Sequence, residues 1–145
     1  MTHRRAACAV ATMFVALAFA ALAAQGKRVT ASESRVRLPA AGETQAMAFV
    51  TIENPTMYGI YLVSATADAA GKVELRDGSQ SGNARLKPVA FISVPAYDRI
   101  DMEPGGPHLL LLDLKRPLKE GDKVALTLST DNAGTLEVSA IVRRE

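Results

Sequence analysis

The sequence contains one cysteine, two histidines and no tryptophan among its 145 residues. The cysteine, Cys8, and one histidine, His3, lie at the extreme N-terminus. The rest of the chain therefore has no disulfide, no thiolate metal site and no cysteine nucleophile. His108 supplies the one imidazole that remains there for catalysis or metal binding.

An excess of charge of either sign is also absent once the N-terminus is set aside. Without Arg4 and Arg5, fifteen basic residues balance fifteen acidic ones, and no basic cluster is present. This composition gives no support for binding to nucleic acid or to an acidic membrane. The chain also lacks a glycine-rich phosphate loop and a marked nucleophilic serine, and a zinc site would need three or four ligands. We therefore expect a protein that is not an enzyme and has no nucleic-acid partner.

Residues 1–23 have the features of a secretory signal peptide. A cationic head, "MTHRR", precedes an uncharged alanine-rich run, and "ALA" at 21–23 places small residues before a cleavage site. The run is long enough to anchor a chain in a membrane, but alanine is a weak anchor and polar residues follow at once. We expect cleavage after Ala23 or Ala24, export to the periplasm and no stable membrane insertion of the mature chain. Cys8 precedes most of the apolar run, which argues against lipidation.

Short β-strands are predicted over most of the remaining sequence. Apolar and polar residues alternate in 123–130 and 134–142, as in strands with one buried face. The segment "HLLLLDL" at 108–114 is apolar on both faces, as in a central strand covered by a second sheet. No stretch has a convincing helical period. We predict a flexible lead-in at 24–34 and a single all-β domain at 35–145, with seven or eight strands in a Greek-key barrel or sandwich. Within it, 71–89 is expected to form two short strands around a loop.

Copper is the metal that the available donors favour. Soft Cu(I) accepts thioether sulfur and imidazole where no thiol is present. His108 stands at the head of the leucine run, directly after the turn at Pro104–Pro107. Met47 and Met102 are expected to fill the core. Met57, in the turn "NPTMYG", is either an exposed loop residue or a loop ligand.

Several segments resemble the periplasmic copper chaperone PCu(A)C family, with a likeness that covers nearly all of residues 44–142. They are "FVTIEN", "GKVELRD", "RLKPV", "SVPA", "MEPGGPHLLLLDLKRPLKEGDKVALTL" and "AGTLEVSAIV". The most specific part runs from "EPGG-x-H-L-x-L" to "PLKEGD". The resemblance implies a cupredoxin-like Greek-key β-barrel that carries Cu(I) through the periplasm. Its partner would be a copper-receiving protein, such as a copper-site subunit of a respiratory oxidase.

The resemblance also implies four ligand positions, of which this chain keeps one. The family binds copper with two histidines and two methionines. Arg76 in "VELRD" stands where the family has a histidine, and Leu86 in "RLKPV" stands where it has a methionine. The family's His-x-Met pair reads His108-Leu109-Leu110 here. His108 is thus the retained metal ligand, and Arg76, Leu86 and Leu110 are substituted positions.

The substitutions remove donors and add a charge. Leucine matches methionine in volume but has no lone pair. A guanidinium stays protonated, and at about 5 Å from Cu(I) it would repel the ion by about 3 kcal/mol at an effective dielectric near 20. Arg76 avoids this if it turns outward and pairs with Asp77, a surface contact of about 0–1 kcal/mol.

Two functional hypotheses follow. In the first, the protein is an exported copper chaperone that binds Cu(I) through His108, with Met57, Met102 or another protein's ligands completing the site. In the second, it is a periplasmic interaction module that kept the fold, lost the metal site and has no cofactor. His108 would then be a partly exposed histidine hydrogen-bonded at a strand end. A further alternative is a small anion held between Arg76 and a protonated His108.

Overall fold

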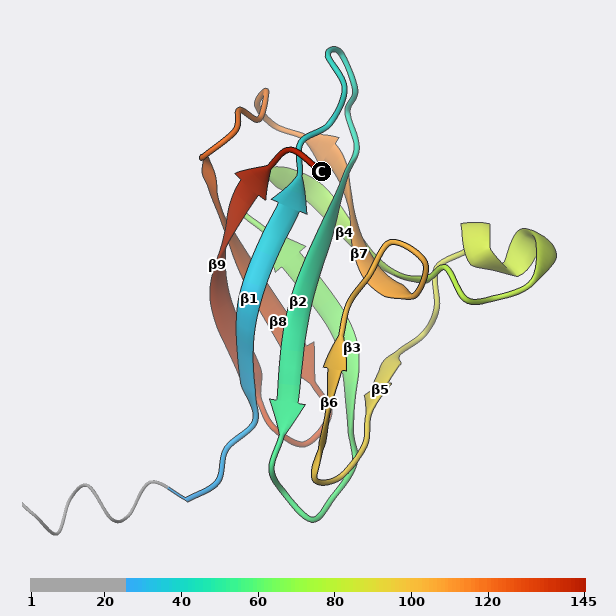
Figure 1. Cartoon of the computed structure of the whole chain (residues 1–145), viewed down its shortest axis with the longest axis vertical. Helices are drawn as coiled ribbons and strands as arrows, with labels where there is room; N and C mark the ends of the chain where they lie inside the picture. Colours follow the sequence, from blue (N-terminus) through green and yellow to red (C-terminus); the bar gives the residue numbers. More distant parts are fainter. Residues whose placement is uncertain (1–25) are drawn as a thin grey trace, which may run out of the picture.

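A computed structural model describes residues 26–145, which form nine β-strands and one short 3-10 helix (Figure 1). The expected signal peptide at 1–23 lies outside the described residues. The elements are β1 Thr30–Arg37, β2 Ala46–Asn54, β3 Ile60–Ala67, β4 Ala70–Asp77, η1 Gly82–Leu86, β5 Ile92–Val94, β6 Asp98–Asp101, β7 Pro107–Leu114, β8 Lys123–Thr130 and β9 Thr135–Arg143. The all-β prediction is confirmed.

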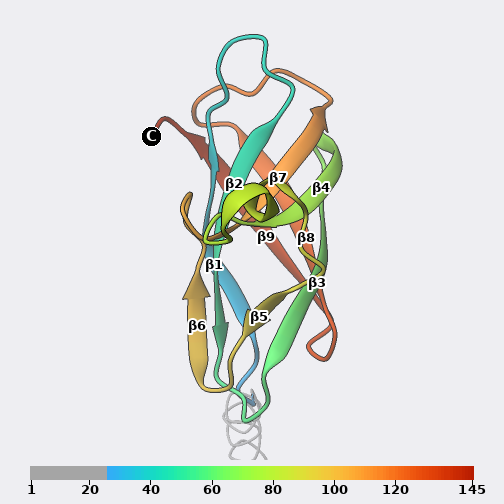
Figure 2. The same ribbon diagram turned by 90° about the vertical axis from the view of Figure 1, so that its right-hand side faces the viewer.

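The strands form one sheet that curls into a nearly closed barrel (Figures 1 and 2). Their order is β4-β7-β2-β1-β9-β8-β3-β5, and β6 also pairs with β2. The β1–β9 pair is parallel and the other pairs are antiparallel. The segment between η1 and β5 helps to close the gap beside β4, because Val89 donates its backbone N–H to the Leu75 carbonyl at 2.8 Å.

The barrel is filled by alternating apolar residues from most of its strands. In β7, Leu109 and Leu111 are fully buried, and β8 contributes Val124, Leu126 and Leu128 at 1% exposure or less. Each such side chain stabilises the fold by about 1.5–3 kcal/mol through burial of apolar surface. The predicted inward faces of β8 and β9 are therefore confirmed, and the core needs no disulfide.

Two sequence predictions about local structure are wrong. The flexible lead-in predicted at 24–34 includes the start of β1, which begins at Thr30 and pairs with β2 and β9. Its sequence, "TASESRVR", lacks apolar alternation because Val36 is its one fully buried residue. The second short strand predicted within 71–89 is instead η1. Here the polar, glycine-containing segment forms a turn of 3-10 helix beside β4.

Strands β6 and β7 follow one another along the same edge of β2, and this arrangement positions His108. Asp101 of β6 lies opposite Thr51, and Leu109 of β7 lies opposite Ala48. The chain between the two strands has more residues than the opposing stretch of β2, so it leaves the sheet as a loop (Figure 1). His108 lies where the chain returns from this loop to the sheet.

Candidate metal site

The outward face of β4 and β7 brings the predicted site residues together. Side chains alternate along a strand, so His108 and Leu110 lie on the face of β7 opposite to Leu109 and Leu111, which enter the core. In the β4–β7 ladder, Arg76 is the direct partner of His108, and Glu74 is the partner of Leu110. Two of the three substituted positions therefore flank the retained histidine.

His108 is buried and held in one orientation. It is 6% exposed, so the expectation of a partly exposed histidine is wrong. Its Nδ1 lies 2.9 Å from the Gly106 carbonyl oxygen. A carbonyl can accept but not donate, so Nδ1 carries a proton, and in the neutral ring Nε2 then keeps its lone pair. The ring lies 6.3 Å from the Phe49 ring, centroid to centroid. The imidazole thus has the tautomer that a metal ligand needs at Nε2.

The Gly106 carbonyl joins the histidine to the end of β4. It accepts a second hydrogen bond, from the backbone N–H of Gly78 at 2.9 Å. A Cβ on Gly78 would lie 2.9 Å from the Pro104 carbonyl oxygen, which is too close for a side chain. Glycine at this position therefore lets the 104–107 loop pack against the chain that leaves β4.

Arg76 forms its ion pair with Glu74, so the expected pairing with Asp77 is wrong. Its Nη2 lies 2.5 Å and its Nε 3.0 Å from Glu74 Oε2, and Lys72 Nζ lies 3.1 Å from the other carboxylate oxygen. The hydrogen bond from Arg76, followed by that from Lys72, lowers the pKa of the Glu74 carboxyl below its ordinary value. Asp77 instead accepts hydrogen bonds from Ser79. Glu74 thereby offsets part of the charge that Arg76 brings to the site.

The third substituted position, Leu86, lies at the end of η1. Its side chain is 65% exposed, while its backbone carbonyl accepts a hydrogen bond from Arg76 Nη1. Arg76 therefore connects η1 to β4 and also faces His108. Of the four positions that the resemblance implied, Arg76, His108 and Leu110 are neighbours on β4 and β7, while Leu86 is connected to them through its backbone carbonyl.

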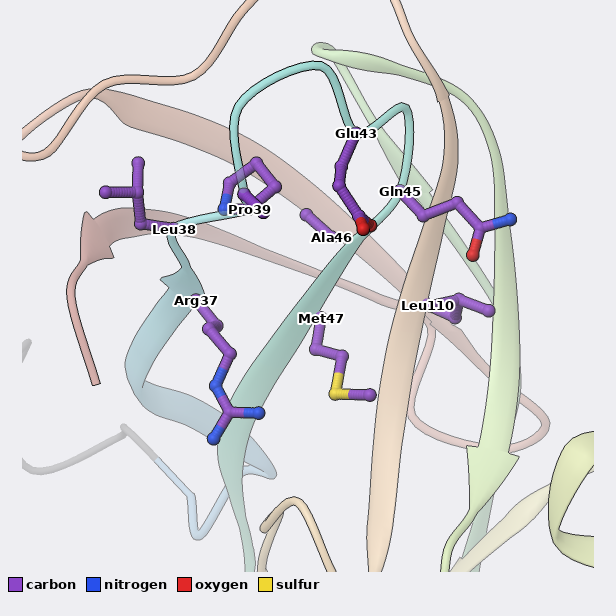
Figure 3. Close-up of a pocket in the computed structure, with 9 residues that line it drawn as sticks. Arg37, Leu38, Pro39, Glu43, Gln45, Ala46, Met47 and Leu110 are labelled. Carbon is purple, nitrogen blue, oxygen red and sulfur yellow. The ribbon is translucent and has the colours of Figure 1, made fainter.

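The three methionines of the described chain occupy very different places. Met57 is 61% exposed in the loop between β2 and β3, and Figure 1 shows this loop at the lower end of the barrel. Met102 is 2% exposed and belongs to the core, as predicted. Met47 is half-buried at the edge of the core and lies directly opposite Leu110. It lines a cavity of about 250 Å³ with Leu110 and Arg37 (Figure 3).

The complete four-ligand copper site of the resembling family does not fit these residues. Leu86 and Leu110 offer no lone pair, and a protonated guanidinium at position 76 cannot coordinate a cation. Among residues 26–145, no three His, Cys, Asp or Glu side chains are grouped as a metal site. The imidazole of His108 is the donor that remains at the inherited positions.

Sequence reasoning missed Glu74 and the carbonyl of Gly106. The first carries a usable signal, because Glu74 and Arg76 are two residues apart in a strand and so share a face. The second is a backbone group, and no residue pattern identifies which carbonyl a histidine will contact. Both groups matter for metal binding, because Glu74 offsets the charge of Arg76 and the Gly106 carbonyl places a proton on Nδ1 of His108.

The barrel, with a histidine at the head of a central strand, defines a copper-chaperone-like fold of the cupredoxin type. Residues 29–142 match the family described as "Putative lipoprotein LpqE-like". The chain belongs to this family. It is 30% identical over 112 residues to "Putative lipoprotein Lxx21020" of Leifsonia xyli subsp. xyli, which covers 76% of this chain and 68% of that protein.

Solved structures with the same fold bind copper. The solution structure of Cu(I)-DR1885 from Deinococcus radiodurans is 31% identical, covers 85% of this chain and 83% of its own, and has a TM-score of 0.69. The copper-bound PCuAC domain from PmoF2 is 25% identical, covers 83% and 95%, and has a TM-score of 0.70. The predicted cupredoxin-like barrel is thereby confirmed. The family and these neighbours are lipoprotein-type and copper-binding domains rather than enzymes, as expected. No helix in the described part of the chain is long and apolar enough to cross a membrane.

Proposed function

We propose that the protein is an exported copper chaperone-like protein that binds and passes on Cu(I). Its site is centred on His108 and has fewer ligands than the four of the resembling family. The observation that carries this proposal is the state of that histidine. Its Nδ1 is bound to the Gly106 carbonyl, so in the neutral ring the lone pair that can bind a metal belongs to Nε2. The likeness to copper-binding domains, one of them 31% identical, supports copper as the ion.

Export rests on the N-terminal sequence and on the family. Residues 1–23 act as a cleaved signal, and the β-domain that follows begins with β1 rather than at residue 35. The relative from Leifsonia xyli is described as a lipoprotein, which supports export. In this chain Cys8 precedes most of the apolar run, so cleavage without lipidation is proposed. The mature protein would act in the periplasm.

A site with fewer ligands is better suited to transferring copper than to storing it. Fewer donors hold the ion more weakly, and a vacant coordination position lets a receiving protein add its own ligands before His108 releases the ion. The copper site of an oxidase subunit is the kind of partner proposed. Arg76 does not prevent this, because Glu74 offsets part of its charge.

A Cu(I) competition titration tests the proposal on the chain that begins at residue 24, which contains every described strand and the whole described core. A chelator of moderate strength should lose Cu(I) to this protein, and the His108→Ala variant should compete much less. The matched control is Met57→Leu, a change at an exposed loop residue, which should compete as the unmodified protein does. No competition, or competition that survives His108→Ala, would reject the proposal.

The second candidate is a copper-free interaction module, and the Arg76 network favours it. Arg76 pairs with Glu74 within β4, and its hydrogen bond to the Leu86 carbonyl connects β4 to η1, two of the elements that a metal would otherwise bridge. In that case Cu(I) should leave the melting temperature unchanged, because a ligand that binds only the native state must raise it. A copper-dependent rise in melting temperature would exclude this candidate.

A further inference from the structure

The outward face of the sheet places a methionine beside the retained histidine. Met47 of β2 is the direct cross-strand partner of Leu110 of β7. Leu110 lies two residues after His108, so the three side chains share one face. The opposite face at this level is core, because Ala48 and Leu109 are both fully buried.

The register places Met47 diagonally across from His108. Diagonal neighbours in an antiparallel pair lie about 7–8 Å apart, within reach of long side chains. Methionine has three rotatable bonds and a polarisable sulfur, and Figure 3 shows the Met47 thioether beside β7. On the other strand, the bond from His108 Nδ1 to the Gly106 carbonyl fixes the imidazole. One donor is thus rigid and the other is adaptable.

We propose that Met47 supplies the sulfur that is missing at Leu110, so that Cu(I) is held between His108 Nε2 and Met47 Sδ. This inference rests on the proposed function and names its second ligand. An imidazole and a thioether are both donors that Cu(I) accepts. Leu110 lines the same cavity as Met47 and lies two residues after His108 on β7, so it would contribute a hydrocarbon wall to the site.

The other two methionines of the described chain do not suit this role. Met57 lies beyond the end of β2, and Asn54 at that end is about 16 Å along the strand from Phe49 at about 3.3 Å per residue. Met102 is 2% exposed within the core, and its backbone N–H is bound to the Val50 carbonyl. Met57 is therefore too far along the barrel to reach His108, and recruiting Met102 would require the barrel to open.

Two arginines, Arg76 and Arg37, flank the proposed site, and each is paired with a carboxylate. Arg76 is engaged by Glu74 and by the Leu86 carbonyl, and so is held on the β4 side of His108. Met47 lies on the β2 side, across β7 from Arg76. The proposed ion would therefore lie between β7 and β2, away from Arg76. Arg37 of β1 lines the cavity beside Met47, and its Nε lies 3.5 Å from Glu145 Oε2, so this carboxylate offsets part of the second positive charge.

The chain from residue 24, labelled with carbon-13 at the methionine methyl groups, allows a direct test by NMR. The probes are Cu(I) and Ag(I), a soft monovalent ion that does not change oxidation state during titration. The Met47 methyl signal and the His108 ring signals should shift together and saturate at one equivalent. The Met57 and Met102 signals should stay in place. Met47→Leu should weaken binding by about tenfold or more, a change of the size that one lost ligand interaction of about 1.4 kcal/mol produces.

The outcomes separate this inference from the proposed function. A shift of the His108 signals without a shift of Met47 overturns the inference and leaves the proposed function standing. The absence of any shift overturns both. A shift of Met57 in place of Met47, or equal affinities of the Met47→Leu and Met57→Leu variants, also overturns the inference. Leucine keeps the volume of methionine, and an unchanged melting temperature verifies that Met47→Leu is folded.

Discussion

Arg76 and His108 face each other as direct partners across the β4–β7 ladder. The Arg76 guanidinium donates its hydrogen bonds to Glu74 and to the Leu86 carbonyl, while the His108 imidazole donates to the Gly106 carbonyl. A permanent cation and the imidazole proposed to bind the metal thus occupy neighbouring positions, each with its own hydrogen-bond partners. This arrangement reconciles the arginine with the copper-chaperone-like fold, and it generates the following predictions.

Restoring the three substituted ligands should create a tight copper site. The triple variant Arg76→His, Leu86→Met, Leu110→Met replaces a cation and two hydrocarbons with three donors around His108. We expect Cu(I) affinity to rise by about a hundredfold or more, since removal of the guanidinium alone relieves repulsion of up to about 3 kcal/mol. Chelator competition measures the gain, and adding His108→Ala to the triple variant should reverse most of it. An unchanged affinity would mean that the ligand positions are misplaced.

Removing the carboxylate that offsets Arg76 should weaken copper binding. In Glu74→Gln the guanidinium loses its ion pair, so its repulsion of a nearby Cu(I) increases by an amount bounded at about 3 kcal/mol. Chelator competition at low ionic strength should detect this loss, and added salt should reduce it. Glu137→Gln is the matched control, because it removes the same charge from an exposed position on β9. If both variants lost the same Cu(I) affinity, the effect would come from the change in net charge and not from the contact between Glu74 and Arg76.

The same carboxylate should make the unfolding free energy depend on acid pH. Hydrogen bonds from Arg76 and Lys72 lower the pKa of Glu74 from its ordinary 4.5. A group with a lowered folded pKa contributes its stabilisation above the unfolded value, and loses it as the pH falls through the folded value. Urea unfolding of the unmodified protein and of Glu74→Gln should therefore differ at neutral pH and converge in strong acid. If the difference in unfolding free energy between the two proteins grew as the pH fell, the proposed role of the ionised Glu74 would be contradicted.

Met102 should behave as a core residue and not as a ligand. Its side chain is 2% exposed, so Met102→Ala should destabilise the fold by about 2–5 kcal/mol through lost burial and a residual cavity. Met57→Ala, at an exposed site, should change the unfolding free energy by no more than about 0.5 kcal/mol. Denaturant unfolding measures both values. The Cu(I) affinity of the folded fraction should be the same in both variants, and a copper-specific loss in Met102→Ala would contradict this assignment.

A methyl group at Gly78 should disturb the loop that orients His108. The added Cβ would lie 2.9 Å from the Pro104 carbonyl oxygen, and overpacking of this kind costs about 1–3 kcal/mol. Gly78→Ala should therefore lower the melting temperature and weaken Cu(I) binding together. Gly105→Ala places its methyl in open space in the same loop and should leave both unchanged. If Gly78→Ala also left the melting temperature and Cu(I) binding unchanged, the loop would not position the histidine.

Much of the fold was determined by the sequence alone. Alternation in β8 and β9 and the leucine run of β7 identified strands because a half-buried or fully buried strand requires those patterns. The same spacing placed His108 and Leu110 on one face. Strand β1 was not predicted, because a single fully buried residue, Val36, does not produce an alternating pattern of apolar and polar residues.

The tertiary structure decided the chemistry of the site. Which carboxylate Arg76 joins, which carbonyl fixes His108 and which methionine lies opposite Leu110 depend on how the chain packs in the assembled sheet, and strand register is a property of that sheet. Met47 and Leu110 are distant in sequence and become neighbours through the pairing of β2 with β7. A linear pattern reports the face to which a side chain points. The residue opposite it is set when the strands pair.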